Sequence, residues 1–400
     1  MKRLFIVAES ISDLPNKKFD DRTPLELSRT PNLDRMAKNG CIGLCNVLPS
    51  SCIPGSDVGF ISLLGSNPSK SRGARGYFEI KGLGLDLKDD AVPFRVNLIP
   101  IQEGVATSYA STSISDDECS VIVSVLNECF KDIPLSFYPI SGYRMALAIN
   151  KEWLFEGKRN NLKMHNLQNN AKFILQDNFP KGNGSAKLIQ IMNSALEILS
   201  AHEINQVKID LGENPANGIW LWSNETPKGI NNFKKLFSAD GICVPGSHLV
   251  RGICIEAGLE TVNVIGAHKG GQETLNARVD AAMNAFKFSD MVILHIETID
   301  DVSKEGDLHK KCQSIESFDE KVVGRMIDFL ETKGEFRILV TSSHSTLIQS
   351  KLPTRMPVPW VLYGSGVKPD KSNAFNEKEA QTSRFSTVAG EKLLKKTLFI

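Results

Sequence analysis

The sequence predicts an α/β protein with a mainly parallel sheet flanked by helices and a smaller inserted α+β domain. The apolar run LFIVAE at residues 4–9 is typical of a strand buried in a parallel sheet. In the C-terminal half, strand-like segments alternate with helical segments, which also indicates a parallel sheet. Short alternating strands and turns prevail between residues 71 and 181. For 400 residues we therefore expect a core domain of residues 1–70 and 182–400 and an inserted domain of residues 71–181.

Two segments near the N-terminus predict helices with defined starts. In the first, Thr30 suits an N-cap, Pro31 suits the first helical position, and Asp34 lies in the first turn. In the second, LPSSCIPGSDVGFISLLG, a Pro-Gly turn directly precedes Ser56 and an apolar helical stretch follows. We therefore expect Ser56 at or just before the N-terminus of a helix.

The other strands are predicted from short apolar segments between turns. Within the inserted domain these are YFEIKGLGLDL (77–87), PFRVNLIPI (93–101) and GYRMALAI (142–149). In the C-terminal half, after a helical stretch at 185–202, they are ANGIWLWS (216–223), VNVIGA (262–267), MVILHI (291–296), RILVTS (337–342) and WVLYG (360–364). The first strand and these C-terminal strands are expected to share one sheet.

Composition argues against several classes of partner. The 47 Lys and Arg residues nearly cancel the 46 Asp and Glu residues, so no global field favours nucleic acid or an anionic membrane. Glu9 ends the first apolar run too early for a signal peptide, and no apolar stretch is long enough to cross a membrane. The eight cysteines show no CxxC spacing, which favours reduced thiols and a cytoplasmic location. Composition does not predict the oligomeric state.

Six segments that follow one another along nearly the whole chain carry a family resemblance. They are DRTPLELSRTPNLDRMAKNG, PGSDVGFISLLGSNP, RGYFEIKGLGLDL, PFRVNL, ANGIWLW and HIETIDD. Together they resemble the archaeal-type cofactor-independent (2,3-bisphosphoglycerate-independent) phosphoglycerate mutases of the alkaline phosphatase superfamily. This resemblance implies an alkaline-phosphatase-like core with an inserted domain. It also implies phosphoryl transfer between 3-phosphoglycerate and 2-phosphoglycerate through a covalent serine intermediate.

By the same resemblance, Ser56 stands at the position of the catalytic nucleophile. A hydroxyl is a weak nucleophile unless a metal or a base removes its proton. The family uses two divalent metals for this step, and paired cations also stabilise charge on the attacking and leaving oxygens. From spacing alone, an ordinary helix-capping serine is the alternative for Ser56.

The metal positions implied by the resemblance are only partly kept. Besides Ser56, Asp300 and His344 match ligands of the family. Glu9 replaces an aspartate, and its extra methylene displaces the carboxylate. The plain alternatives are a hydrogen-bonded histidine at a strand end for His344 and a loop or capping carboxylate for Asp300.

Three further positions carry residues that cannot replace the family's ligands. Lys304 stands in place of a histidine, and a protonated lysine has no acceptor atom. Ser343 replaces an aspartate. Pro353, or its neighbour Leu352 or Thr354, replaces a second histidine. We therefore expect Mn²⁺, Zn²⁺ or Mg²⁺ to bind weakly or not at all. The Lys304 ammonium either fills the place of a missing cation and pairs with Glu9, Asp300 or a bound phosphate, or is simply solvated.

Six residues are candidates for substrate binding by the same resemblance. Arginine suits phosphate and carboxylate groups because its guanidinium forms two parallel hydrogen bonds. For each arginine taken alone, an ordinary ion pair is the alternative. The candidates are Asp57, Arg72, Arg75, Arg95, Arg144 and Arg251.

Three functions follow as hypotheses. The first is a divergent homologue of phosphoglycerate mutase, a pseudoenzyme without metal-dependent mutase activity. The second is an active mutase or related phosphotransferase with an altered or metal-poor site. The third is a non-catalytic protein that binds a phosphorylated small molecule or a protein partner. In each case we expect one site at the carboxyl edge of the main sheet, formed by Glu9, Ser56, Asp300, Lys304, Ser343 and His344.

Overall fold

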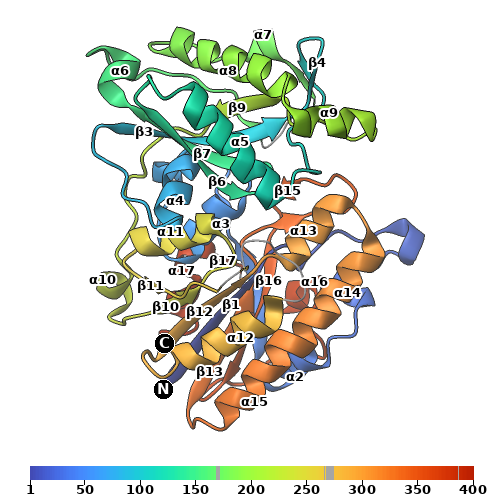
Figure 1. Ribbon diagram of the computed structural model, residues 1–400. Helices are drawn as coiled ribbons and strands as arrows, with labels where there is room; N and C mark the ends of the chain where they lie inside the picture. The colour runs from blue at the N-terminus through green and yellow to red at the C-terminus, as the bar shows by residue number, and fades with distance from the viewer. Residues whose placement is uncertain (168–171, 265, 267–273, 386) are drawn as a thin grey trace. The chain divides into compact units, whose positions relative to one another are not determined.

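The computed structural model describes residues 1–167, 172–264, 266, 274–385 and 387–400 (Figure 1). The chain forms two compact units. The core unit contains Met1–Lys70 and Gly229–Ile400, and the inserted unit contains Ser71–Lys228.

The inserted unit extends beyond the predicted boundary at residue 181. Strand β9 (Gly218–Trp222) pairs antiparallel with β3 (Ala91–Ile99), so it belongs to the inserted unit and not to the large sheet. Helix α8 (Ser185–Ser200) packs on β9 and belongs there as well. The predicted boundary was wrong because β9 pairs with a strand more than 100 residues away, which the local pattern cannot reveal.

The core unit is built on an eight-stranded sheet in the order β11-β10-β12-β1-β13-β16-β2-β17. Only β16 runs against its neighbours, so the predicted mainly parallel α/β fold is confirmed. The strands are β11 (Glu260–Thr261), β10 (Ile242–Val244), β12 (Met291–Ile296), β1 (Lys2–Ala8), β13 (Phe336–Thr341), β16 (Val358–Gly364), β2 (Cys41–Asn46) and β17 (Val388–Ala389). The strand predicted at 262–267 is replaced by the shorter β11 just before it, and residues 265 and 267 lie outside the described residues.

The register of the three central strands positions the site. Val7 of β1 pairs with His295 of β12 on one side and with Thr341 of β13 on the other. The carboxyl ends of these three parallel strands are therefore level. The loops that follow β1, β12 and β13 consequently leave the sheet at the same edge.

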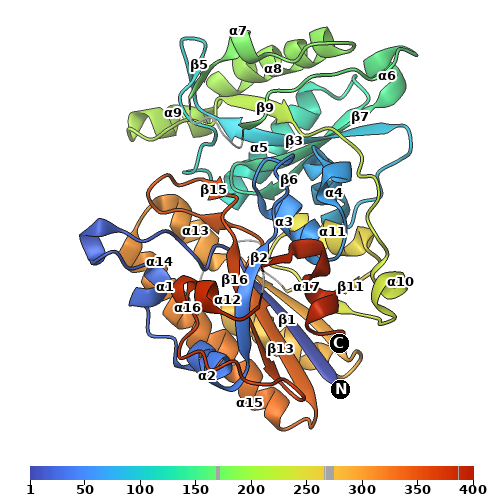
Figure 2. The same ribbon diagram turned by 180° about the vertical axis from the view of Figure 1, so that it is seen from behind.

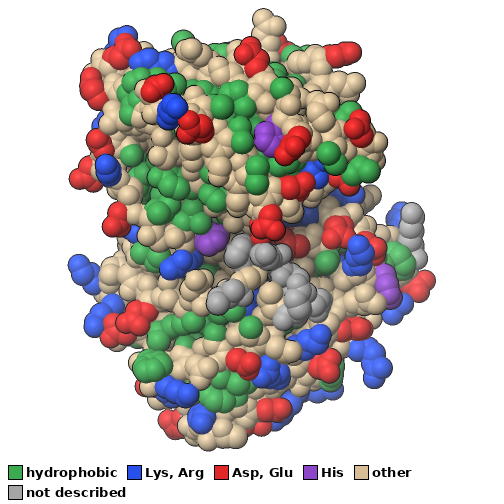
Figure 3. Space-filling model, viewed as in Figure 1, with side chains coloured by type: hydrophobic (Ala, Val, Ile, Leu, Met, Phe, Trp, Pro, Cys, Tyr) green, Lys and Arg blue, Asp and Glu red, His purple; other side chains and the backbone are tan. Residues whose placement is uncertain are grey.

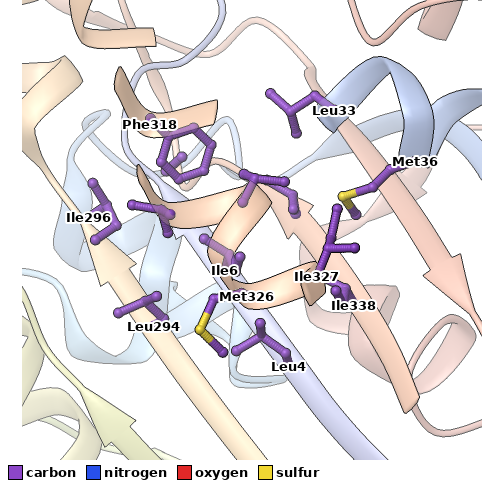
Figure 4. Packing of buried hydrophobic residues seen from close by; sticks show 14 of the residues in the cluster. Leu4, Ile6, Leu33, Met36, Leu294, Ile296, Phe318, Met326, Ile327 and Ile338 are labelled. Atoms are coloured by element: carbon purple, nitrogen blue, oxygen red, sulfur yellow. The ribbon is translucent and has the colours of Figure 1, made fainter. Parts of the chain in front are cut away.

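One face of the sheet carries the largest apolar core. Residues such as Leu4, Ile6 and Leu294 point from the strands toward Met326 and Phe318 of the covering helices (Figure 4). The helical segments on this face are α2 (Pro31–Asn39), α12 (Thr274–Ala285), α14 (Leu308–Phe318), the π-helical segment η5 (Asp319–Gly324), α15 (Arg325–Glu331) and α16 (Glu377–Thr382).

Helix α2 begins at Pro31 as predicted, but its N-cap differs from the expectation. The Thr30 side chain makes no capping hydrogen bond. Instead, the Asp319 carboxylate accepts hydrogen bonds from the backbone N–H groups of Asn32 (3.1 Å) and Leu33 (2.7 Å). An acid from a distant segment thus satisfies N–H groups that the local sequence leaves open.

The other face of the sheet is covered by helices that include α3 and α17 (Figure 2). A Cβ atom at Gly390 would collide with the Ser62 hydroxyl, which shows how closely α17 packs on α3. Helix α3 begins at Ser56, as predicted. The remaining helical and strand segments of the core unit are η1 (Lys17–Phe19), α1 (Pro24–Leu27), α3 (Ser56–Leu63), η2 (Pro68–Ser71, reaching the first residue of the inserted unit), α10 (Phe233–Phe237), α11 (His248–Glu256), α13 (Thr298–Glu305), α17 (Gly390–Lys396), β14 (Ser345–Thr346) and β15 (Pro353–Thr354).

The inserted unit holds a four-stranded antiparallel sheet in the order β6-β7-β3-β9 and a smaller sheet of β4, β5 and β8. The strand predicted at 77–87 is wrong, because this segment contains helix α4, which packs on β3. The polar Glu79 separates the apolar Phe78 and Ile80, and this alternation in the sequence mimics a strand. The elements not yet given are α4 (Arg75–Gly82), β4 (Ile101–Gln102), β5 (Val105–Ala106), α5 (Asp116–Cys129), β6 (Leu135–Ser141), β7 (Arg144–Asn150), α6 (Lys151–Phe155), β8 (Phe173–Ile174), α7 (Leu175–Asn178) and α9 (Glu203–Asp210).

The surface agrees with the balanced composition. On the face drawn in Figure 3, basic and acidic side chains are interspersed rather than collected into patches of one sign. Among the described residues, no helix combines the length and apolarity needed to cross a membrane.

Candidate functional site

Five of the six residues predicted to form one site contact one another at the carboxyl edge of the large sheet. Glu9 follows β1, and Ser343 and His344 follow β13. Asp300 and Lys304 lie on α13, which starts two residues after β12. The level strand ends therefore bring the three segments together, as the sequence predicts.

Glu9 lies at the centre of this group and has no exposed surface. One carboxylate oxygen accepts a hydrogen bond from Nε2 of His295 at 2.8 Å. Nδ1 of His295 in turn accepts from the backbone N–H of Gly246 at 3.2 Å, so His295 is neutral with its proton on Nε2. The second oxygen of Glu9 accepts from the Ser343 hydroxyl and faces Nδ1 of His344 at 2.9 Å.

Asp300 is the second buried carboxylate of the group. One of its oxygens binds the Lys304 ammonium at 2.5 Å. The other accepts hydrogen bonds from the hydroxyls of Ser10 (2.7 Å) and Thr346 (2.5 Å). It also faces Nε2 of His344 at 3.3 Å. The His344 ring thus bridges the two carboxylates, with one nitrogen directed at each.

Helix α3 packs directly against this group. A Cβ atom at Gly59 would collide with the carbonyl oxygen of Ser343, and the ring of Phe60 meets the ring of His295 edge to face at 5.5 Å. Ser56 is half-buried at the start of the same helix, and Asp57 is the next residue. In the part of the chain that the structure describes, Ser56 forms no hydrogen bond with the ionic side chains.

The comparisons with known proteins identify the family. The model of the metalloenzyme superfamily matches residues 1–398. The 2,3-bisphosphoglycerate-independent phosphoglycerate mutase of Methanothrix thermoacetophila is 31% identical over 399 residues, which cover 99% of each chain. A probable enzyme of the same name from Geobacter sulfurreducens is 32% identical over 403 residues and covers each chain completely. The chain belongs to the cofactor-independent phosphoglycerate mutase family, within the metalloenzyme superfamily.

Solved structures support the fold of this phosphoglycerate mutase relative. The PH0037 protein from Pyrococcus horikoshii superposes with a TM-score of 0.81 at 23% identity, covering 99% of this chain and 96% of that chain. The cofactor-independent phosphoglycerate mutase from Thermoplasma acidophilum gives a TM-score of 0.59 at 20% identity, covering 100% and 99%. At these identities the likeness establishes the fold alone.

The charges of the site balance without any added ion. Burial lowers the pKa of His344, but Glu9 and Asp300 outweigh burial and raise it to about 9. Burial raises the pKa of Glu9, but His344 and His295 outweigh it and lower the pKa to about 2. For Asp300, Lys304 and His344 likewise overcome burial and hold the pKa well below its usual value. At neutral pH the group therefore contains two carboxylates, one imidazolium and one ammonium, with a net charge of zero.

The side chains at the positions that the resemblance assigns to metal ligation are engaged with one another. The two nitrogens of His344 face the carboxylates of Glu9 and Asp300, and an imidazole binds a metal only in its neutral form. Lys304 places a fixed positive charge on Asp300, and Ser343 offers a hydroxyl that already donates to Glu9. Among the described residues, no three His, Cys, Asp or Glu side chains are arranged to hold a metal ion.

Pro353 lies beside the site without contributing to it. It pairs with Thr346 in the two-residue ladder of β14 and β15. Thr346 donates its hydroxyl to Asp300, so the position of Pro353 is one residue removed from the ionic group. Proline has neither an acceptor nor a donor side chain.

The candidate substrate-binding arginines fall into both units. In the core unit, Arg251 of α11 donates to the Thr261 hydroxyl at 3.4 Å. In the inserted unit, Arg72 is exposed, whereas Arg95 is 4% exposed and forms an ion pair with Glu79. For Arg95 the ion pair that we kept as the alternative is therefore present, in the interior of the unit.

Burial lowers the pKa of Arg95 and Glu79 opposes this shift; the nearby charges of Arg144 and Arg75 lower the pKa further. Each also stacks on an aromatic ring: Arg75 lies 5.7 Å from the centroid of Trp222, and Arg144 lies 5.2 Å from that of Tyr143. Three arginines are thus gathered in the inserted unit.

Sequence reasoning missed three members of the site, namely His295, Ser10 and Thr346. For His295 a signal was present, since a single polar residue in the otherwise apolar strand MVILHI must find a partner when it is buried. The two hydroxyl residues gave no such signal.

The ion network predicts a specific dependence of stability on pH. The pKa of His344 in the folded state is raised from 6.5 to about 9. The stabilisation that protonated His344 gives to the fold is therefore complete below pH 6.5 and is lost as pH rises through 9. At about 1.4 kcal/mol per pKa unit, this corresponds to about 3 kcal/mol. The same ion pair lowers the pKa of Glu9 from 4.5 to about 2. The stabilisation that ionised Glu9 gives to the fold is therefore present above pH 4.5 and is lost as pH falls through about 2.

Urea unfolding in a chelating buffer at pH 6.5, 8 and 9.5 would test the alkaline part of this prediction. The wild type should lose stability over this range more steeply than His344→Gln, which lacks the titrating group. Parallel profiles for the two proteins would contradict the assignment.

Gly59→Ala should destabilise the protein, because the added methyl group meets the Ser343 carbonyl. We expect a loss of about 1–3 kcal/mol in the free energy of unfolding, the usual cost of overpacking. Ser56→Ala on the same helix is the control and should change stability by less than about 0.5 kcal/mol. Equal stability of Gly59→Ala and wild type would show that α3 does not pack as described.

Proposed function

We propose that this chain is a divergent relative of the cofactor-independent phosphoglycerate mutases that lacks metal-dependent mutase activity. The observation that carries the proposal is the ion pair between Lys304 and Asp300, at a position that the resemblance assigns to metal ligation. An ammonium held at 2.5 Å from this carboxylate repels a divalent cation and satisfies the same oxygen.

The chemistry of Ser56 supports the same proposal. Its hydroxyl needs a metal or a base to become a nucleophile. His344 cannot accept a proton while it is an imidazolium whose two nitrogens face the Glu9 and Asp300 carboxylates, and a protonated Lys304 cannot accept one either. The two carboxylates hold their charge through the ion network and are therefore weak bases.

Binding of a phosphorylated small molecule without turnover is the second candidate function. It is favoured by Arg75 and Arg144, which lie near the buried Arg95–Glu79 ion pair in the inserted unit, since guanidinium groups suit phosphate and carboxylate. 3-Phosphoglycerate is the natural probe, because it is a substrate implied by the family. Arg144→Gln should weaken its binding, whereas Lys131→Gln, at an exposed ion pair of the same unit, should not.

Metal analysis and calorimetry test the main proposal. The wild-type protein should be purified without chelators, analysed for Mn, Zn and Mg, and then titrated with Mn²⁺ at pH 7.5. We expect substoichiometric metal and no binding in the micromolar range. The Methanothrix thermoacetophila relative, treated identically, is the comparison protein. Tight binding of one or two ions by this chain would overturn the proposal.

An active enzyme with a metal-poor site is the competing possibility. It requires turnover that survives chelation and is lost in Ser56→Ala. Such a result would retain the mutase reaction and reject the pseudoenzyme proposal.

A further inference from the structure

The core unit contains a second candidate binding pocket that is separate from the ion network. It has a volume of about 240 Å³. Its base includes Arg337 on β13, and its walls include residues of β16, β17 and α17. Arg337 is the second residue of β13, whereas Ser343 follows the end of that strand. At about 3.3 Å per residue, the two positions are about 20 Å apart along the sheet.

The pocket lies on the sheet face opposite the core of Figure 4. Side chains alternate along a strand, and Val361 points into that core. Trp360 and Leu362, on either side of Val361, therefore face the other way and line the pocket. Helix α17 packs beside β2 and β17 on this side of the sheet (Figure 2).

Four positive side chains line the pocket, and none of its described lining side chains is acidic. They are Arg337, Lys368, Arg384 and Lys396. Arg337 donates to the uncharged backbone carbonyls of Ser365 (2.9 Å) and Thr397 (3.3 Å). It also donates to Ile400 (3.2 Å), the last residue of the chain, whose terminal carboxylate offsets the Arg337 charge.

Within the described residues, none of these four cations pairs with an Asp or Glu side chain. The acid adjoining this region, Asp370, already accepts from the Ile42 N–H (3.0 Å) and the Ser372 hydroxyl (2.9 Å). With the Ile400 carboxylate beside Arg337, the charges of Lys368, Arg384 and Lys396 remain unopposed by an acidic side chain. These like charges repel one another, and a bound anion would relieve the repulsion.

The apolar part of the pocket defines the rest of the ligand. Trp360 and Phe385 form a tilted ring pair with centroids 5.7 Å apart, and Arg384 stacks on the Phe385 ring at 5.1 Å. Trp360 is 3% exposed, whereas Phe385 is 37% exposed. Leu362, Val367 and Val388 add aliphatic surface. Pockets that combine apolar walls with a few charged groups are typical of small-molecule sites.

We propose that this pocket binds a small organic anion, in which a phosphate or carboxylate group contacts the basic residues and a flat apolar body packs against Trp360 and Phe385. Guanidinium groups bind both kinds of anion through paired hydrogen bonds. An aromatic body would gain further energy from ring packing.

Calorimetry with simple probes tests this proposal on the full-length protein. Phenyl phosphate and benzoate carry the two possible charged groups on an aromatic body, and whichever binds more tightly identifies the preferred group. Inorganic phosphate and phenol each supply only half of the ligand and should bind at least about tenfold more weakly.

Two matched double variants locate the binding. Lys368→Gln/Lys396→Gln removes two pocket charges from exposed positions, and we expect at least about tenfold weaker binding of the preferred probe. Lys392→Gln/Lys395→Gln removes the same charge from exposed positions of α17 outside the pocket, and binding should be unchanged. Tryptophan fluorescence gives a second readout, because Trp360 is the only tryptophan of the core unit, and Trp360→Phe should abolish the probe-dependent change.

Three outcomes would overturn the proposal. The first is the absence of binding of both aromatic anions at millimolar concentration. The second is equal weakening by the two double variants, which would indicate a general charge effect. The third is equal affinity for inorganic phosphate and phenyl phosphate, which would remove the role of the aromatic rings.

Discussion

Restoring four ligands together should restore metal binding. The quadruple variant Glu9→Asp, Lys304→His, Ser343→Asp and Pro353→His replaces the fixed ammonium and returns carboxylate and imidazole groups that suit Mn²⁺ or Zn²⁺. We expect its affinity for Mn²⁺ to exceed that of the wild type by at least about 100-fold, or about 2.7 kcal/mol. Calorimetry at pH 7.5 measures this difference directly.

The single variants provide the internal control. Lys304→His alone leaves His344 bridging the two carboxylates, and Pro353→His alone leaves Lys304 on Asp300. Because several deprotonated ligands must be held together before a metal binds well, each single change should alter affinity by less than about tenfold. If the gains in Mn²⁺ affinity were additive across the four positions, they would contradict the view that the ion network must be opened at several positions before a metal binds. A folded quadruple variant without metal affinity would show that the residues around the ligands have changed as well.

Removing the central imidazolium should greatly lower the free energy of unfolding. His344→Leu leaves the buried carboxylates of Glu9 and Asp300 facing each other without the cation between them. Breaking a buried ion pair from one side costs about 3–5 kcal/mol, and we expect a loss of this size in the free energy of unfolding at pH 7. Urea titration followed by circular dichroism gives the value.

His309→Leu is the matched control, since His309 is an exposed histidine on α14. It should change stability by less than about 0.5 kcal/mol. Adding Glu9→Gln and Asp300→Asn to His344→Leu removes the unpaired charges and should recover part of the loss. A loss below about 1 kcal/mol for His344→Leu would mean that the buried network does not hold the strand ends together.

The sequence predicted the fold where local pattern determines it. The apolar run at the N-terminus forms the buried strand β1, and helix α3 begins at Ser56 directly after Pro54-Gly55, both as expected. The meeting of Glu9, Asp300 and His344 was also predictable, because parallel strands that share a register end at the same edge of the sheet.

The sequence did not predict features that depend on distant partners. Strand β9 joins the inserted unit through its pairing with β3, and the N-cap of α2 comes from Asp319. In α4 an alternating pattern misled the prediction, because packing on β3 outweighs the local signal. The network itself depends on side-chain positions. The i,i+4 spacing of Asp300 and Lys304 allows their ion pair, but no spacing in the sequence reveals that His344 bridges two acids.

A further buried ion pair lies next to the site. Lys311 is fully buried and binds Asp13 at 2.8 Å, and its ammonium also contacts the carbonyls of Ser12 (3.3 Å) and Thr346 (3.1 Å). Thr346 in turn donates to Asp300. The edge of the sheet is therefore lined by paired charges whose partners come from within the chain.

A coupled mutase assay tests the central claim most directly. The wild-type protein is incubated with 3-phosphoglycerate and saturating Mn²⁺, Zn²⁺ or Mg²⁺, and formation of 2-phosphoglycerate is followed through a coupling enzyme, with the Methanothrix thermoacetophila relative as the positive control. Our account predicts no turnover above that of Ser56→Ala under any metal condition. Metal-dependent turnover of the wild type that disappears in Ser56→Ala would contradict it.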